Sequence, residues 1–278
     1  MRPPHRSSNH SPPAARRHRF EQSKEETPMR AIAVANQKGG VGKTATVLNL
    51  GAALAEMGER VVLVDLDPQA NLTAISGADE VELTTHDLLL SPDVDLRDIV
   101  QPTPIENLLV APSEYALAAA EASLAGAERR QSRLADKLDS LAEGIIAIID
   151  TPPSLGFLTI NALSAAPEVL IPVQCAFLAM KGLQQLLRTV EGVRERANPD
   201  LAILGLLLTM YDARTVHAEE VKGRLKAHFG DQVFDTVIPR TVAFDYATVA
   251  ATPLVHLRPE SPGAEAYRAL AQEVIDRA

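Results

Sequence analysis

The sequence contains a single cysteine, Cys175, and no tryptophan, and aromatic residues make up only 4 % of its 278 residues. One cysteine excludes an intrachain disulfide framework and any metal cluster held by several cysteines of one chain, and it favours a reducing compartment. No segment approaches the roughly 18 consecutive apolar residues of a membrane-spanning helix, and the N-terminus lacks the apolar core of a signal peptide. We therefore expect a soluble protein of the cytoplasm.

Aliphatic residues supply most of the hydrophobic content, which is 46 % of the chain and is dominated by Ala, Leu, Val and Ile. This composition fits strands buried on both faces better than it fits an aromatic-rich β-sandwich. The chain is long enough for one large α/β domain or two small ones, and a domain of this size buries roughly three quarters of the surface of its unfolded chain. A sizeable core is therefore expected.

Charge is distributed unevenly along the chain. The net charge is −9, but residues 1–28 hold six Arg and Lys against three Glu, which leaves −12 on the remainder. This first segment is rich in Pro, Ser, Arg and His and has no hydrophobic periodicity, so we predict a disordered basic arm over 1–28 and a single domain over 29–278. The arm can be a dispensable tail, an extension upstream of Met29 as the natural start, or a contact to DNA phosphates. The acidic remainder does not exclude nucleic acid, because binding depends on a local basic face.

From Met29 onward, apolar runs alternate with helical patterns, which favours a mostly parallel, twisted sheet with helices on both faces. The predicted strands cover 31–35, 61–65, 108–111, 145–150, 169–173, 203–210 and 233–238. The predicted helices cover 44–57, 114–142, 154–165, 178–197, 215–229 and 262–277, and Gly58 is a natural stop for the first of them. In such a fold, ligands bind beyond the carboxyl ends of the strands.

The segment Asn36–Thr44 follows the first predicted strand and opens the first predicted helix, which is the context of a phosphate-binding loop. Its three glycines let the backbone curl with its N–H groups pointing inward, and the start of the helix adds the positive end of its dipole. Lys43 would reach the β- and γ-phosphates, and the Thr44 hydroxyl would ligate Mg²⁺. The predicted nucleotide contacts from this region are Lys38, Gly39, Gly40, Val41, Gly42, Lys43, Thr44 and Ala45. The fold class predicted from the whole pattern is α/β and P-loop NTPase-like.

The loop differs from the common pattern G-x-x-x-x-G-K-[ST] at its start. Gln37 stands where the pattern has its first glycine, and Lys38 adds a second lysine before the glycines. The alternative interpretation is a flexible glycine turn with two solvated lysines, and the strand before the loop and the helix after it argue against that.

Aspartates follow two other predicted strands at the same edge of the sheet. Asp65 and Asp67 end one apolar run, and Asp150 ends another. An aspartate at such a position can hold Mg²⁺ directly or through water, or it can cap the next helix. Beside a phosphate loop we favour the magnesium interpretation.

These motifs, taken together, resemble those of the ParA/Soj/MinD family of deviant Walker-A ATPases, and most of all the short Soj-type partition ATPases. The similar stretches are Lys38–Thr44, Asp65–Asn71, Ile149–Ser154, Thr209–Thr215, Val237–Val242 and Ser261–Tyr267, so the resemblance spans essentially all of 29–278. The pair Lys38 and Lys43 is the most specific element, because it distinguishes this family from ordinary P-loop proteins.

The resemblance implies an ATP-dependent sandwich homodimer in which Lys38 crosses to the nucleotide of the opposite subunit. It implies ATP and Mg²⁺ as cofactors, Lys38, Lys43 and Asp67 as catalytic residues, and Thr44, Asp65 and Asp150 as residues near the metal. Pro239 and Arg240 would lie over the adenine base. Hydrolysis should be slow in isolation, because the sequence offers no evident arginine finger to neutralise the transferred phosphate.

The same resemblance implies two further partners. One is a ParB-type centromere-binding protein that stimulates hydrolysis, and the other is double-stranded DNA bound without sequence preference through Arg214, Arg240 and Lys222. The sequence differs from its relatives on the DNA side, where Thr241, Ala243 and Thr252 replace residues that include the usual basic ones. The segment 174–177 also lacks a glutamate that many relatives carry.

The leading hypothesis is therefore a nucleoid-associated cytoplasmic ATPase that segregates a chromosome or plasmid. A membrane-surface switch of the MinD type is a second hypothesis, but Tyr267–Ala278 carries no basic excess for a membrane-binding helix. A non-hydrolysing, ATP-gated scaffold is a third, if the changed DNA face reflects a lost function.

Overall fold

The computed structural model describes residues 29–78, 81–138, 141–175 and 179–278, so the predicted arm over 1–28 lies outside the described residues. Its centre is an eight-stranded sheet with the order β3-β4-β2-β5-β1-β6-β7-β8. The strands are β1 (Arg30–Val34), β2 (Arg60–Asp65), β3 (Gln101–Pro102), β4 (Leu108–Ala111), β5 (Ile145–Asp150), β6 (Glu168–Gln174), β7 (Ala202–Tyr211) and β8 (Val233–Pro239). Every neighbouring pair is parallel except β3 and β4, which confirms the predicted mostly parallel sheet.

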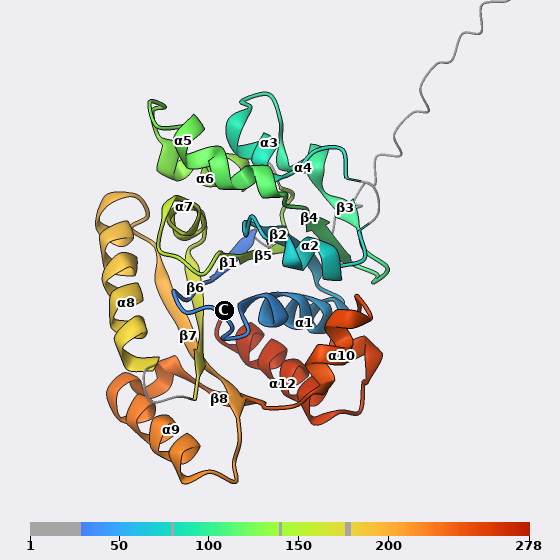
Figure 1. The fold of residues 1–278 in the computed structure, drawn as a ribbon, viewed down its shortest axis with the longest axis vertical. Coiled ribbons are helices and arrows are strands. Elements are labelled where there is room, and N and C mark those ends of the chain that lie inside the picture. Colours follow the sequence, from blue (N-terminus) through green and yellow to red (C-terminus); the bar gives the residue numbers. More distant parts are fainter. Residues whose placement is uncertain (1–28, 79–80, 139–140, 176–178) are drawn as a thin grey trace, which may run out of the picture.

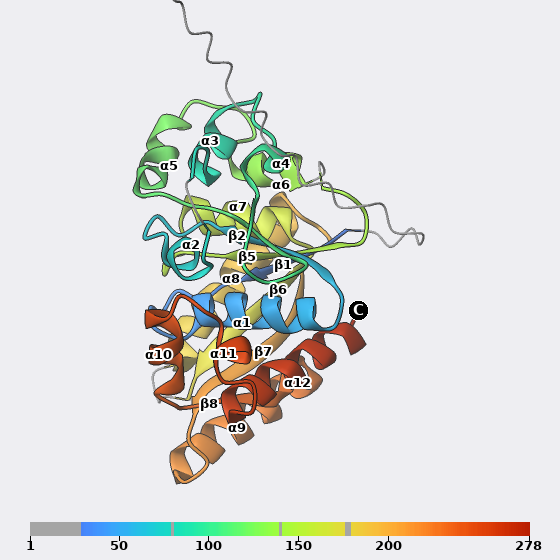
Figure 2. The same cartoon turned by 90° about the vertical axis from the view of Figure 1, so that its right-hand side faces the viewer.

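Helices cover both faces of this sheet (Figures 1 and 2). They are α1 (Lys43–Glu56), α2 (Asn71–Ile75), α3 (Thr85–Leu90), α4 (Leu96–Ile99), α5 (Ala120–Ser123), α6 (Arg133–Leu138), α7 (Phe157–Ala165), α8 (Ala179–Arg196), α9 (Val216–Phe229), α10 (Ala243–Val249), α11 (Leu254–Leu257) and α12 (Pro262–Asp276). Figure 2 shows α1 and α12 on the side of the sheet away from α3 to α6.

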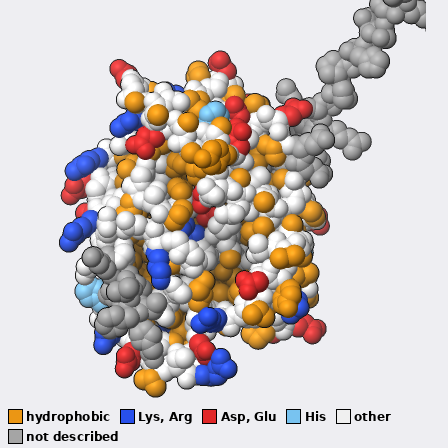
Figure 3. All heavy atoms as spheres, in the orientation of Figure 1, with side chains coloured by type: hydrophobic (Ala, Val, Ile, Leu, Met, Phe, Trp, Pro, Cys, Tyr) orange, Lys and Arg blue, Asp and Glu red, His pale blue; other side chains and the backbone are white. Residues whose placement is uncertain are grey.

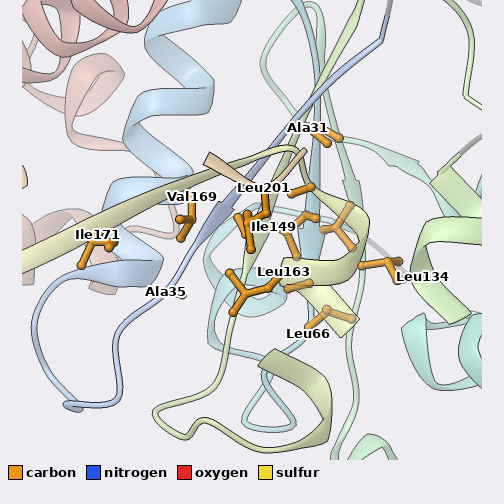
Figure 4. Packing of buried hydrophobic residues seen from close by; sticks show 14 of the residues in the cluster. Ala31, Ala35, Leu66, Leu134, Ile149, Leu163, Val169, Ile171 and Leu201 are labelled. Carbon is orange, nitrogen blue, oxygen red and sulfur yellow. The ribbon is translucent and has the colours of Figure 1, made fainter. Parts of the chain in front are cut away.

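Alternation along the buried strands divides the core into two clusters. On β1, Ala31 and Ala33 point to the face covered by α7 and α8, whereas Ile32 and Val34 point to the face covered by α1 and α12. Both sets are fully buried, as expected for a central strand of a parallel sheet. Figure 4 shows part of the first cluster, in which Ile149 of β5 lies beside residues of α7.

The prediction of one long helix over 114–142 is wrong. That stretch forms a 3-10 turn at Tyr115–Ala119, then α5, a second 3-10 turn at Arg130–Ser132, and α6. Helix α5 ends at Ser123, and residues 124–129 are not helical; Arg129, at the start of the second 3-10 turn, adopts a left-handed conformation with φ 53°. The bends let leucines from separate pieces, including Leu117 and Leu134, reach the same core cluster.

Other differences concern short elements. The sequence did not predict β3 or the short helices α2, α3, α4, α10 and α11, and α7 begins at Phe157, three residues after the predicted start. The predicted stop after α1 is confirmed, because Gly58 follows the helix with φ 93°, a conformation open to glycine. Within the described residues, no helix is both long and apolar enough to cross a membrane.

Strand register brings the predicted site residues to one edge of the sheet. Val34 at the end of β1 pairs with Asp150 of β5, and Asp150 also pairs with Asp65 of β2. The loop after β1 therefore begins beside both aspartates, at the carboxyl ends of three adjacent strands.

Candidate functional site

The loop between β1 and α1 has the backbone of an anion-binding turn. Gly40 and Gly42 adopt φ angles of 69° and 87°, in the left-handed region where a side chain would be strained. Gly42 is the N-cap of α1 and has no side chain that could cap the N–H groups of that helix's first turn. Uncapped N–H groups at a helix N-terminus favour a phosphate, so the geometry suits the predicted loop.

Neighbouring strands hold this loop in place. The Asn36 side chain donates to the Pro172 carbonyl at the end of β6 over 2.7 Å, and its Oδ1 accepts from the Lys38 N–H over 3.0 Å. The Thr209 hydroxyl of β7 donates to the Val41 carbonyl over 2.9 Å. The loop is therefore fixed by polar contacts from β6, which lies beside β1 in the sheet, and from β7, the next strand along.

The two lysines of the loop lie in opposite environments. Lys43 is 7 % exposed, and burial lowers the pKa of its ammonium group, while Asp150 and Asp67 act in the other direction. Lys38 is exposed, and its Nζ donates to Gln174 Oε1 at the end of β6 over 2.6 Å. Lys43 therefore lies in the interior of its own chain, whereas Lys38 lies at the surface.

Asp150 is a fully buried carboxylate, and neither of its oxygens has a hydrogen-bond partner among the described residues. Burial, and then the neighbouring Asp65, raises the pKa of Asp150 to about 8. The Thr44 hydroxyl partly offsets this rise, although it does not meet hydrogen-bond geometry with either oxygen, and Lys43 acts in the same direction. A buried carboxylate without a partner next to a threonine hydroxyl is a suitable donor set for Mg²⁺.

Asp65, in contrast, is occupied by its own chain. Its Oδ1 accepts from the Asp67 N–H over 3.0 Å, and its Oδ2 accepts from the Thr73 N–H and hydroxyl over 2.9 and 2.8 Å. Burial raises its pKa to about 6 against these hydrogen bonds. Asp65 therefore holds the start of α2 in place beside Asp150. Asp67 is 8 % exposed, and its Oδ1 accepts from the Gln69 N–H over 3.0 Å.

A cavity of about 560 Å³ opens beside the loop. Gly42 and Ala45 form one wall, and the segment from β8 to α10 forms the opposite wall with Pro239 and Arg240, the predicted base contacts. The remaining lining residues are Thr209, Met210, Asp212, Arg214, Ile238, Thr241, Val242, Phe244, Asp245 and Tyr267. The position next to the phosphate loop and the mixed lining suit a nucleoside.

Sequence reasoning missed most of this lining as nucleotide contacts. Met210 is the clearest case, because it has φ 53° inside β7, where the register with β8 shifts between Leu208 and Tyr211. A strained residue at a strand bulge often marks a ligand site. No signal in the sequence indicates that bulge, although the stretch around Met210 was among those that resemble the family.

Two buried contacts join α1 to α11 and α12. Asn49 Oδ1 accepts from the Leu254 N–H over 2.7 Å, and Asn49 Nδ2 donates to the Ala45 carbonyl over 2.8 Å. The Tyr267 hydroxyl lies 3.2 Å from the Thr46 hydroxyl. Helix α1 is thus tied through polar groups to α11 and α12, which support the 238–245 wall.

The predicted DNA contacts fall in two places. Arg214 and Arg240 both line the mouth of the cavity, and Arg214, 89 % exposed, pairs with Asp212 at 2.8 Å. Hydrogen bonds from Arg214 lower the pKa of Asp212 to about 2. Lys222 lies on α9 with its Nζ 5.7 Å from the Tyr211 ring centroid. Figure 3 shows Lys and Arg side chains near the left edge and the lower part of the molecule, interspersed with acidic ones.

A family model and two relatives of known name match most of this chain. Residues 29–203 match the family model described as an AAA domain. The chain is 48 % identical over 246 residues to the sporulation initiation inhibitor protein Soj of Bacillus subtilis, covering 87 % of this chain and 97 % of that protein. It is 44 % identical over 255 residues to the chromosome partitioning protein ParA of Caulobacter vibrioides, covering 90 % and 95 %.

A solved structure agrees with these sequence relatives. A crystal structure described as cobyrinic acid a,c-diamide synthase from Mycobacterium smegmatis, with bound ADP and magnesium, is 42 % identical with a TM-score of 0.76 and covers 88 % of this chain and 93 % of that one. A second crystal structure of the same protein holds an ATP analogue and magnesium. The agreement of loop geometry, sheet order and these matches over most of the described length shows that the chain belongs to the ParA/Soj/MinD family of P-loop ATPases.

Proposed function

We propose that the protein is a DNA-partitioning ATPase in which ATP brings two copies together face to face. The observation that carries this proposal is the difference in burial between the two lysines of the loop. Lys43 is buried beside Asp150 and Asp67, whereas Lys38 of the same loop is exposed, and among the described residues its ammonium group contacts a neutral amide and no carboxylate. Two facing triphosphates bring several negative charges together, and an exposed second cation on each loop can neutralise the partner's charge.

Within one chain, each predicted residue has a distinct role in this proposal. Lys43 contacts the β- and γ-phosphates, while Thr44 and Asp150 hold Mg²⁺, which neutralises developing charge on the transferred phosphate. Asp67 orients the attacking water, and Asp65 holds α2 close to the metal. Pro239 and Arg240 contact the adenine base, which the cavity between them and Ala45 supports.

The ATP dimer then binds double-stranded DNA without sequence preference, and a ParB-type protein stimulates hydrolysis and releases it. The names of two relatives, the chromosome partitioning protein ParA of Caulobacter vibrioides and the chromosome-partitioning ATPase Soj of Thermus thermophilus, support the role in partitioning. Arg214 and Arg240 are candidate DNA contacts because both are exposed, and Lys222 is a third. Binding through phosphates should weaken steeply with added salt, and a flat salt response would remove DNA from the proposal. The proposed location is the cytoplasm, in association with the nucleoid, and the division at Met29 stays a prediction.

The central test compares Lys38→Ala with the unchanged protein. With a non-hydrolysable ATP analogue and Mg²⁺ at saturating concentration, we expect the unchanged protein to sediment as a dimer and Lys38→Ala as a monomer that still binds the analogue. Lys43→Ala is the comparison variant, because it should lose nucleotide binding itself. A protein that stays monomeric at saturation, or a Lys38→Ala variant that dimerises equally well, would refute the proposal.

A MinD-type membrane switch has less support, because the arginines of the last helix are engaged within the fold. Arg268 donates to Glu56 over 2.6 Å, and the guanidinium group of Arg277 donates to Glu273 over 2.9 Å and lies over the Phe234 ring. They cannot form a free basic face for lipid without breaking these contacts. ATP turnover measured with DNA, with a ParB-type protein, with both and with anionic vesicles separates the partition, membrane and scaffold hypotheses. Turnover that depends on cobyrinic acid would instead favour the activity named for the Mycobacterium smegmatis structure.

A further inference from the structure

The Lys38 side chain is held by a second residue from outside the phosphate loop. Its Nζ lies 2.6 Å from Gln174 Oε1, at the last position of β6. Two positions earlier on the same strand, the Pro172 carbonyl accepts from Asn36, whose Oδ1 in turn accepts from the Lys38 N–H. Hydrogen bonds to the end of β6 therefore position both the backbone and the ammonium group of Lys38.

The acceptor at this contact is neutral. Among the described residues, no carboxylate forms an ion pair with Lys38, so its positive charge is not compensated within the chain. An amide oxygen takes one of the three ammonium donors and leaves two for another acceptor. A carboxylate in the same place would neutralise the charge and compete with a phosphate for it.

An exposed lysine without such a contact would lose much conformational entropy when it is fixed at an interface. Its side chain has four rotatable bonds, and fixing them at an interface opposes association by up to about 2 kcal/mol on the usual entropy scale. A lysine that is already held by a neutral acceptor loses less of this freedom when the complex forms.

We infer that Gln174 is a positioning residue that pre-orders Lys38 for the nucleotide of the facing subunit. The inference rests on the proposed function, because it takes the crossing of Lys38 as given, and it assigns the residue that makes that crossing efficient. Gln174 does not itself touch the nucleotide of its own chain in this assignment. Its action runs entirely through Lys38, so its effect must disappear when Lys38 is removed.

Two nearly isosteric substitutions test the role. Gln174→Met keeps the length and volume of the side chain but removes the acceptor, and Gln174→Glu keeps the acceptor but adds a negative charge. Gln272→Met is the matched control, since Gln272 is an exposed glutamine on α12 that contacts Asp276 instead. Each variant is made with and without Lys38→Ala, and the dimer dissociation constant is measured by analytical ultracentrifugation with a non-hydrolysable ATP analogue and Mg²⁺; in the Lys38→Ala background the protein concentration is raised until its weaker dimer is populated.

A lost hydrogen bond to a partly solvated cation changes an equilibrium about threefold, and a symmetric dimer contains two such contacts, so Gln174→Met should weaken dimerisation about tenfold. Gln174→Glu should weaken dimerisation at least as much, because the new carboxylate pairs with the Lys38 ammonium group. Affinity of the monomer for the analogue, measured at protein concentrations below the dimer dissociation constant, should stay unchanged in both variants, which a general structural defect would not allow. The control should dimerise normally.

Other outcomes overturn the inference in distinguishable ways. If Lys38→Ala abolishes dimerisation but Gln174→Met dimerises as well as or better than the unchanged protein, Gln174 does not pre-order the lysine and the proposed function survives. If Gln174→Met weakens dimerisation equally in the Lys38→Ala background, the effect does not run through Lys38. If Lys38→Ala itself dimerises normally, the inference falls together with the proposed function.

Discussion

Replacing Asn49 should weaken binding in the base cavity without weakening binding of phosphates at the loop. Asn49 lies in the middle of α1 and is 2 % exposed. Its Oδ1 accepts from the N–H groups of Leu254 and Val255 over 2.7 and 3.4 Å, and its Nδ2 donates to Ala45. Replacing it with alanine removes the contact that fixes α11, and with it the 238–245 wall, against α1.

The expected loss of stability follows from burial. Leu254 is fully buried, so its N–H cannot turn to water when the acceptor disappears, and an unsatisfied buried donor costs about 1–3 kcal/mol. The small cavity left by the side chain adds to this, for a total of about 2–4 kcal/mol. Thr248→Ala is the control, because it removes an exposed hydrogen bond on α10 and should lose less than about 0.5 kcal/mol.

The substitution Asn49→Ala should affect binding of the adenine base and not binding of the phosphates. If α11 supports the wall that contacts adenine, Asn49→Ala should weaken ATP binding while inorganic tripolyphosphate, which reaches only the loop, binds as before. Urea denaturation gives the stability change, and isothermal titration calorimetry gives the two affinities. A stability loss below about 0.5 kcal/mol, or equal losses of affinity for ATP and tripolyphosphate, would refute the coupling.

Three further outcomes are expected. Gly205→Ala should destabilise the fold by about 1–3 kcal/mol in urea denaturation, because its Cβ would lie 2.5 Å from the Phe234 ring, whereas Gly223→Ala, which meets nothing within 4 Å on a helix, should be neutral or stabilising. Burial raises the pKa of the Cys175 thiol to about 11, so iodoacetamide labelling should be slow at about pH 8 and rise about tenfold per pH unit toward pH 10; a free-cysteine rate at pH 8 would contradict this. Asp67→Ala should keep ATP binding and dimerisation but abolish turnover in a phosphate-release assay, and unaltered hydrolysis would exclude the proposed role.

The sequence predicted the central strands and the loop because their signals are local. A buried parallel strand needs a continuous aliphatic run, and the run at 145–150 is recognisable without any tertiary information. The loop is defined by glycines within a few residues of one another, and Gly40 and Gly42 do adopt the left-handed angles that only such residues favour. The position of Asp150 beside the loop also requires that β5 be the neighbour of β1, a strand order that the sequence did not predict.

The base cavity could not be predicted in the same way, since its walls come from segments far apart in the sequence. Ala45, Met210 and Phe244 meet there only because β7 and β8 extend the sheet beyond β6 and the chain then returns over α1. Helix α10 has seven residues, and Tyr246 and Val249 on it are exposed, so its apolar pattern does not indicate which face is buried. The prediction for 114–142 failed for a related reason, because a helical pattern does not reveal the non-helical residues 124–129 that interrupt it.

The buried charges of the site explain why nucleotide and metal should bind together. In the chain alone, burial lowers the pKa of Lys43 and raises that of Asp150, so both groups are pushed away from their charged forms. A triphosphate alone would favour the charged lysine but would repel a charged Asp150, whereas Mg²⁺ alone would favour the carboxylate and repel the ammonium group. Together, Mg²⁺ and the triphosphate add to the mutual attraction of Lys43 and Asp150 and favour the charged form of both side chains. The difference in burial separates Lys43 from Lys38, because the Lys38 ammonium group lies at the surface, where it can act on a second chain.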